Sequence, residues 1–177
     1  MKTTTLFSVM VCFLMLFSCC NVLFPDETLT IQRRDYTGNE LRTDGYYYRF
    51  GQQNNTIVYF LYRNGVILSV GHYYPSQDLD FVEKEILQEK GSNYKSKDHW
   101  GVFVVNGNTI QYEKWIGSSS SSPKAYLYNC TGKILNDTTI HFTESYNSET
   151  NKINAIDEIW HFKKFASKPD STNIFIK

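Results

Sequence analysis

Short runs of alternating apolar and polar residues, separated by turn-forming residues, make up most of the chain from residue 45 to residue 165. This period of two is typical of β-strands. Asn-Gly pairs at 64–65 and 106–107 predict hairpins, because both central residues of a type I′ turn need positive φ. The predicted strands are residues 46–50, 56–62, 66–74, 100–105, 109–116, 126–130, 134–135, 140–146 and 156–165.

One segment has helical spacing instead. Between residues 78 and 90, one apolar stripe consists of Leu79, Val82, Ile86 and Leu87, and Gly91 ends the pattern. These features predict the chain's one helix. Eight or nine mostly antiparallel strands with one short helix predict an all-β closed barrel, with a curled β-sandwich as the alternative.

Two predicted strands are apolar on both faces. In the strand at 56–62 every position from 57 to 62 is apolar, and in the strand at 46–50 every position except Arg49 is apolar. We expect one face of each strand to point into the barrel and the other to lie under the helix or the C-terminal tail. The strand at 109–116 alternates more strictly, with Glu113 on the polar side, and is predicted to be half-buried.

The N-terminus carries a secretory signal. Lys2 precedes an apolar run over residues 6–17, which is too short to be a transmembrane helix. The end of the run resembles the bacterial lipobox, a resemblance that implies cleavage before Cys19 and acylation of that cysteine. An ordinary signal peptide cut near the same place is the alternative. The four lipobox positions are Leu16, Phe17, Ser18 and Cys19.

The chain therefore divides into three predicted parts. Residues 1–18 are the signal peptide, residues 19–43 the lipidated cysteine and a spacer, and residues 44–177 the barrel domain with its C-terminal tail. Leu29 and Ile31 alternatively join a first strand. The apolar patch at 174–176 is expected to dock on the domain.

Charge excludes one class of partner. The chain has 18 basic and 18 acidic residues, and removal of the leader with Lys2 leaves 17 against 18. There is no basic patch of the kind that binds nucleic acid. The expected partner is a membrane, contacted through the lipid. By the lipobox resemblance, Asn21 in place of an inner-membrane retention Asp predicts the outer membrane.

Cysteines and histidines give no metal or redox site. Cys12 leaves with the leader, and Cys130 is expected in the core, with a Cys20–Cys130 disulfide left open. The histidines are scattered without metal-ligand spacing, so no metal or cofactor is expected. They are His72, His99, His141 and His161.

Aromatic residues supply the candidate ligand site. Aromatic content is 16 %, and tyrosine is the most frequent of these residues. The large aromatic side chains either fill the core or line a cavity for a small apolar ligand. The candidates are Tyr46, Tyr48, Tyr59, Tyr112 and Trp160.

Two carboxylates extend this set. If Phe142 faces Trp160 across the last two strands, Glu144 falls opposite Glu158. Three alternatives follow for such a pair: it is solvated at the barrel mouth, it makes a polar contact with a ligand, or it serves as a catalytic acid and base. The third alternative is possible because neighbouring carboxylates raise one another's pKa. We assign no catalytic residue, and a barrel enzyme using this pair is the weakest hypothesis.

The domain resembles the lipocalin-like barrels of Gram-negative lipoproteins. Residues 44–47 (Asp-Gly-Tyr-Tyr) stand where lipocalins place a Gly-x-Trp motif, and residues 99–103 and 106–110 resemble the mid-barrel hairpin. Tyrosine replaces the usual tryptophan, and the helix follows the third strand instead of the barrel. The resemblance implies a lipid-anchored envelope lipoprotein that binds a small apolar ligand. A structural or interaction lipoprotein that docks an envelope protein complex is the alternative.

Overall fold

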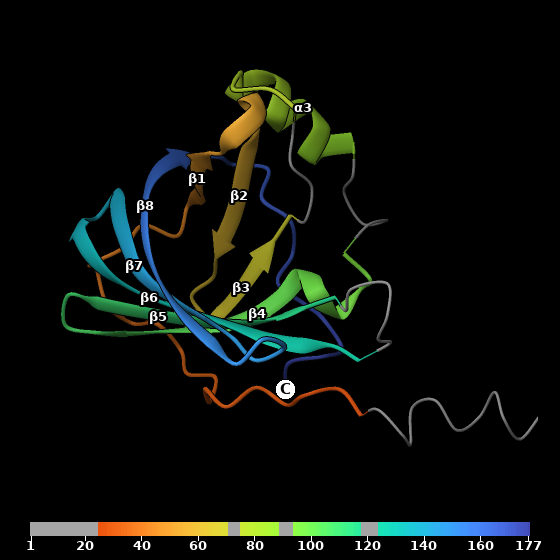
Figure 1. Ribbon diagram of the computed structural model, residues 1–177. Helices are drawn as coiled ribbons and strands as arrows, with labels where there is room; N and C mark the ends of the chain where they lie inside the picture. Colours follow the sequence, from red (N-terminus) through yellow and green to blue (C-terminus); the bar gives the residue numbers. More distant parts are fainter. Residues whose placement is uncertain (1–24, 71–74, 89–93, 118–123) are drawn as a thin grey trace, which may run out of the picture.

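A closed, eight-stranded antiparallel barrel forms the body of the protein (Figure 1). The computed structural model describes residues 25–70, 75–88, 94–117 and 124–177. Consecutive strands pair around the barrel in chain order, and β8 pairs with β1 to close it. Closure leaves no strand edge unpaired. The predicted all-β barrel with one short helix is confirmed, and the sandwich alternative is not observed.

The elements, in chain order, are β1 (Gly45–Phe50), the 3₁₀ helix η1 (Gln52–Asn54), β2 (Thr56–Leu61), β3 (Val66–Ser69), α3 (Leu79–Gln88), the 3₁₀ helix η2 (Lys97–His99), β4 (Trp100–Asn106), β5 (Thr109–Ile116), β6 (Tyr126–Asn136), β7 (Thr139–Asn147) and β8 (Lys152–Lys164). Residues 71–74 of the predicted third strand and 89–90 of the predicted helix lie outside the described residues.

Two predicted strands prove to be one. Residues 131–133 continue the pairing of β6 with β5, so the predicted segments 126–130 and 134–135 join. The polar Thr131 and Lys133 around Gly132 hid this continuity in the sequence. A Cβ at Gly132 would come within 2.5 Å of the carbonyl oxygen of His141, so glycine permits the strands to approach here.

The Asn-Gly hairpins form, but their turns differ from the predicted type. Gly65 has φ 76° and Gly107 φ 58°, while neither preceding asparagine is among the described residues with positive φ. In the β2–β3 turn the Gly65 amide donates to the Tyr62 carbonyl, and the Tyr62 amide donates to the Val66 carbonyl. Only the glycine of each pair therefore needs the left-handed region.

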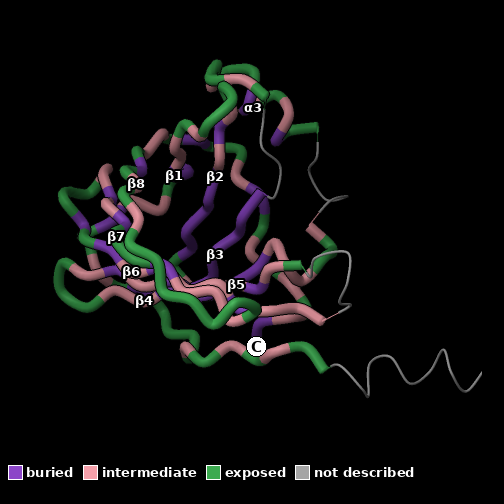
Figure 2. Tube along the Cα trace, viewed as in Figure 1, coloured by how far each residue is buried: buried purple, intermediate pink, exposed green. Residues whose placement is uncertain are grey.

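An outer core lies between the barrel wall and the segments that cover it. Val82 and Ile86 of α3 pack with Tyr46 and Phe60, all four at 0 % exposure. Val82 and Ile86 of the predicted helix stripe are thus buried, whereas Leu87 is exposed. The C-terminal tail docks on the same cluster through Phe175 and Ile176, while Ile174 is exposed. Figure 2 shows the result along β2 and β3, which are buried almost throughout.

An inner core fills part of the barrel interior with side chains from all eight strands. The β2–β3, β4–β5 and β6–β7 turns lie together at one end of the barrel. We name this the closed end, and the opposite end, with the β3–β4, β5–β6 and β7–β8 connections, the open end. Tyr36 and Leu41 belong to the inner core although they precede β1. They close the barrel.

The segment 25–44 lies against the barrel, so its described part is not the free spacer that we expected. It begins at the open end, where the Glu27 amide donates to the Ala125 carbonyl at 3.1 Å. It passes β5, and at the closed end the Leu41 amide donates to the Tyr36 hydroxyl at 2.6 Å. Leu29 and Ile31 contact the outer core without forming a strand. Residues 19–24 lie outside the described part.

Glu113 attaches this segment to β5. Its carboxylate accepts bonds from the Thr30 hydroxyl at 2.8 Å and from the amides of Thr30 and Ile31. Glu113 is only 3 % exposed and Trp115 4 %. The prediction of a half-buried strand is therefore wrong for β5, because the N-terminal segment covers its outer face.

The predicted register between β7 and β8 is also wrong. Phe142 pairs with Glu158, and Glu144 with Ala155, because the register shifts between Phe142 and Glu144. The same shift changes which residues of β7 are buried, from Ile140 and Phe142 to Ser145. Glu144 is exposed as a result, and it does not face Glu158.

Lys168 fixes the C-terminal tail to the closed end. Its ammonium donates to the carbonyl oxygens of Thr43 at 2.6 Å and Leu61 at 2.8 Å. It also lies 4.0 Å from the centre of the Tyr62 ring. Burial lowers the pKa of Lys168 to about 8, so the contact holds a partly desolvated cation.

Candidate functional site

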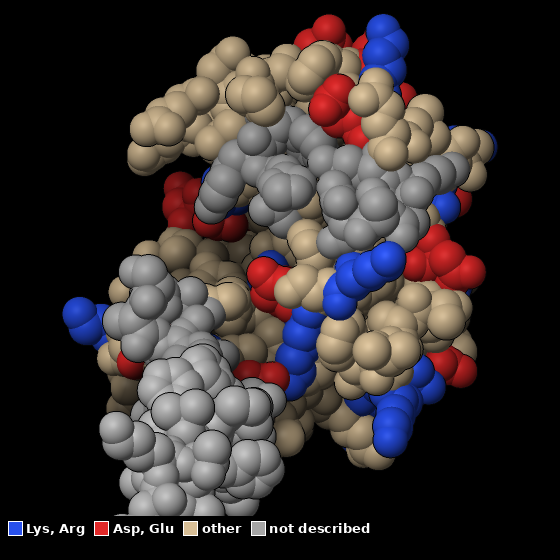
Figure 3. Space-filling view, turned by 90° about the vertical axis from the view of Figure 1, so that its right-hand side faces the viewer, with Lys and Arg blue, Asp and Glu red and all other residues tan. Residues whose placement is uncertain are grey.

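The open end of the barrel holds a cavity of about 420 Å³. Its volume lies in the range of small-molecule sites. Figure 3 looks onto this side of the molecule, where acidic and basic side chains gather around a hollow. The lining comes from seven strands or their ends and from η2. It consists of Arg49, Ile57, Tyr59, Ser69, Asp98, Tyr112, Lys114, Ile116, Gly117, Tyr128, Asn147, Glu158 and Trp160.

Stacked aromatic rings form one wall of the cavity. Trp160 of β8 stacks on Tyr59 of β2, with ring centres 4.4 Å apart and planes 24° apart. Tyr112 of β5 meets Tyr59 edge to face at 5.5 Å. Phe142 packs edge to face against Tyr112 and Trp160. The period of two brings these rings together from four strands, and the wall offers a flat apolar ligand a packing surface.

An ion pair borders this wall. The Arg49 Nη2 lies 3.0 Å from the Glu158 Oε1, and the Trp160 Nε1 donates to the Glu158 Oε2 at 3.2 Å. The Arg49 guanidinium also lies 5.7 Å from the centre of the Trp160 ring. Both carboxylate oxygens of Glu158 are therefore engaged, while the buried Nε of Arg49 has no hydrogen-bond partner among the described residues.

Lys114 is the second cation of the cavity. Among the residues that the structure describes it makes no salt bridge and no hydrogen bond, and its ammonium lies 5.7 Å from the centre of the Tyr59 ring. Burial lowers its pKa to about 8, and the negative charge of Asp98 offsets part of this effect. The ammonium is mostly protonated at pH 7 and incompletely solvated.

Four of the seven predicted ligand residues meet in this cavity: Tyr59, Tyr112, Glu158 and Trp160. The other three do not. Tyr46 lies in the outer core, where its hydroxyl donates to Glu83 of α3 at 3.0 Å. Tyr48 also packs against the outer core, and Glu144 is exposed. The sequence pattern found the aromatic strands but assigned both faces of β1 wrongly.

Three charged lining residues were not predicted as site residues: Arg49, Asp98 and Lys114. The signal for two of them was present. Arg49 is the one polar residue in an apolar run, and Lys114 stands on the same side of its strand as Tyr112. An unpaired charge at an inward position of a strand lowers the stability of the fold. Charged residues at such positions could therefore have been recognised as candidate site residues. Asp98 enters from η2, which the pattern did not predict.

No cysteine or histidine is among the described residues that line the cavity. Cys130 is a buried free thiol in the inner core, and burial raises its pKa to about 11. It is the expected core residue, while Cys19 and Cys20 lie outside the described part. No group of metal-binding side chains occurs among the described residues. His141 instead contacts Asp157 at 2.7 Å.

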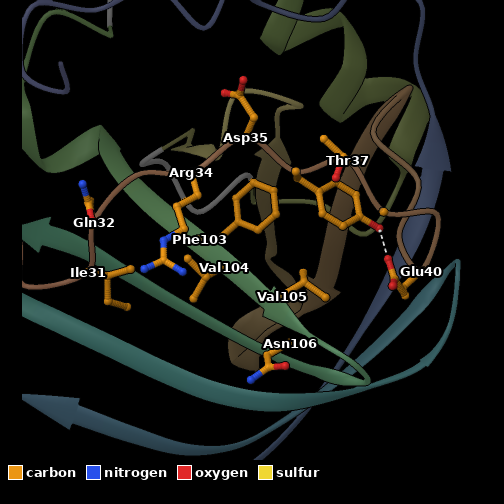
Figure 4. A pocket seen from close by; sticks show the side chains of 12 residues that line it. Ile31, Gln32, Arg34, Asp35, Thr37, Glu40, Phe103, Val104, Val105 and Asn106 are labelled. Carbon is orange, nitrogen blue, oxygen red and sulfur yellow. Dashed lines mark hydrogen bonds between the residues drawn. The ribbon is translucent and has the colours of Figure 1, made fainter.

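A second hollow, of about 620 Å³, lies between the N-terminal segment and β4 (Figure 4). Its rim includes Arg34, Asp35 and Asn106, and Tyr36 donates its hydroxyl to Glu40 at 3.0 Å. None of the buried unpartnered polar atoms found in the described residues belongs to its lining. Its lining includes the cation Arg34 and the rings of Tyr36 and Phe103, but these rings are tilted by 56° and do not stack as Tyr59 and Trp160 do, so the barrel cavity is the candidate site.

Comparisons with protein-family models, with curated proteins and with solved structures find no match to this chain. In the part of the chain described here, no helix has the length and apolar character needed to span a membrane.

Proposed function

We propose that this chain is a lipid-anchored lipoprotein of the bacterial cell envelope whose barrel cavity binds a small, largely apolar ligand. The observation that carries the binding function is the aromatic wall of a cavity that opens at one end of a closed barrel. A barrel interior filled by side chains would leave no room for a ligand, and here the inner core fills only part of it.

The proposal of a lipid anchor is based on the leader sequence. Leu16, Phe17, Ser18 and Cys19 follow an apolar run of signal-peptide length, and the mature chain would begin at Cys19. Several acyl chains on one residue give durable membrane attachment, whereas a single chain binds reversibly. The Glu144–Glu158 mechanism, in contrast, lacks its geometry, since the two carboxylates lie neither opposite each other nor in one cavity.

Ligand binding is tested by fluorescence with the uncharged probe N-phenyl-1-naphthylamine. Trp160 lines the cavity, while Trp100 and Trp115 lie in the outer core. A double Trp100→Phe, Trp115→Phe variant therefore isolates the signal of the cavity. We expect saturable quenching of Trp160 emission with a matching rise in probe emission.

A pair of variants locates the probe. Ser69→Phe places a large side chain into the cavity and should abolish the saturable signal. Thr143→Phe adds the same ring at an exposed position of β7 and should leave the signal unchanged. Equal binding in both variants would contradict a site inside the barrel.

The anchor is tested by palmitate labelling in a Gram-negative host. We expect the label on the intact chain and in a Cys20→Ala variant, and its loss in Cys19→Ala. Fractionation should place the labelled protein in the outer membrane. A released protein without label would favour the ordinary signal peptide.

A further inference from the structure

Lys114 has no ionic partner among the described residues, although it lies in a cavity lined largely by aromatic and apolar side chains. It occupies an inward position of β5 between Tyr112 and Ile116, all three of which line the cavity. Among the described residues it has no salt bridge, and its one described cationic contact is with the Tyr59 ring at 5.7 Å. A partly buried charge of this kind destabilises the fold unless something pairs with it.

The carboxylates of the cavity do not supply that partner. Glu158 is engaged by Arg49 and by the Trp160 indole, at 3.0 and 3.2 Å. Asp98 lies beyond salt-bridge distance from Lys114, and its Oδ1 is buried with no hydrogen-bond partner. Besides Lys114, the charged side chains that line the cavity are Asp98 from η2, Glu158 from β8 and Arg49 from β1, and the charge of Asp98 acts on Lys114.

Arg49 contributes the second positive charge of the same cavity. Its Nη2 is held by Glu158, and its Nε is buried without a partner among the described residues. An acidic group of a ligand would supply the acceptor that Lys114 lacks, and charge-assisted bonds are the strong class of hydrogen bond. The aromatic wall beside them fits the apolar part of the same molecule.

We propose that the ligand of this cavity carries an acidic group, which Lys114 binds, while Tyr59 and Trp160 pack against its apolar body. This inference rests on the proposed binding function and names the chemical class of its ligand, an amphipathic organic acid.

The test compares two probes that differ by one charged group. N-phenyl-1-naphthylamine is uncharged, and 1-anilinonaphthalene-8-sulfonate is the same ring system with a sulfonate. We expect the intact protein to bind the sulfonate about tenfold or more tightly than the uncharged probe, because a charge-assisted contact adds to the same packing.

Variants assign the preference to Lys114. In Lys114→Met the sulfonate should lose its advantage while the uncharged probe binds as before. Asp98→Asn removes a negative charge from the cavity and should increase the preference for the sulfonate. Lys133→Met changes the net charge equally at an exposed site and should have no effect on either probe.

The outcomes separate this inference from the binding function. Equal affinity for the two probes in the intact protein, or a sulfonate preference that persists in Lys114→Met, would overturn the acidic ligand while leaving the binding function in place. If neither probe binds saturably, the binding function fails and the acidic ligand with it. Circular dichroism and urea unfolding of each variant exclude loss of the fold as the cause.

Discussion

The two ends of the barrel are built from different side chains. At the closed end Tyr36, Leu41 and Phe103 are buried in contact with apolar neighbours, and their polar atoms are paired. At the open end Arg49, Asp98 and Lys114 line a cavity with unpaired polar atoms or an unpaired charge. Because unpaired buried polar groups destabilise a fold, we expect the closed end to contribute more stability than the open end, where the proposed ligand site lies.

Removing a large side chain from the closed end should have the largest effect. Phe103 is 1 % exposed and packs against the Tyr36 ring at 5.8 Å. Phe103→Ala is expected to lower the free energy of unfolding by about 3–5 kcal/mol, through lost burial and the cavity left behind. Urea unfolding measures this. A cost under about 1 kcal/mol would show that the closed end is not the stabilising one.

Removing one hydroxyl there should cost less. The Tyr36 hydroxyl accepts the Leu41 amide at 2.6 Å in a buried setting. Tyr36→Phe leaves this amide unpaired and should lower the unfolding free energy by about 1–3 kcal/mol. The exchange of the Leu41 amide hydrogen should accelerate. Tyr146→Phe removes a hydroxyl bonded to exposed Asn151 and is the matched control, with a change within about 0.5 kcal/mol.

At the open end, removing a charged side chain should stabilise the fold instead of destabilising it. Burial lowers the pKa of Lys114 from 10.5 to about 8, which means that its charge destabilises the folded state. Lys114→Met keeps the apolar stem and should raise the unfolding free energy by about 1–2 kcal/mol at pH 7. The gain should shrink between pH 8 and pH 10.5, since there the unfolded chain binds the proton that the folded chain releases. A loss of stability in this variant would remove the contrast between the ends.

The smallest effect is a pH dependence of ligand affinity. The Lys114 ammonium loses its proton as pH rises through about 8, and the sulfonate probe does not titrate in this range. Its affinity should fall up to about tenfold between pH 7 and pH 9. The uncharged probe should bind equally at both values, and Lys114→Met should flatten the profile of the sulfonate. An unchanged profile in that variant would assign the titration to another group.

The parts of the fold that follow a single period were predictable from the sequence. The stripe of Val82 and Ile86 predicted the helix and its packing on the outer core, because a helix repeats every 3.6 residues. The rings of Tyr59, Tyr112 and Trp160 fell on inward positions for the corresponding reason in strands. The pattern thus predicted these elements, but it did not show which face of β1 points into the barrel, because both of its faces are largely apolar.

Two features depend on residues far apart in the chain and were not predictable. Glu113 is polar and was expected to face solvent, but its partners at Thr30 and Ile31 precede it by more than 80 residues. Glu144 was assigned to the inward face, but the register shift after Phe142 moves it to an exposed position. A shift of one residue exchanges the two faces of a strand, and nothing in the alternation signals where it occurs.

The path of the N-terminal segment sets the geometry of the anchored protein. Asp26 and Glu27 are bonded to Ala125 and Trp115 beside the opening of the barrel. Cys19 precedes Pro25 by six residues, which span about 20 Å when fully extended. A lipid on Cys19 would thus hold the entrance within a short reach of the bilayer surface. An amphipathic acid dissolved in that bilayer would then enter the barrel without a long passage through water.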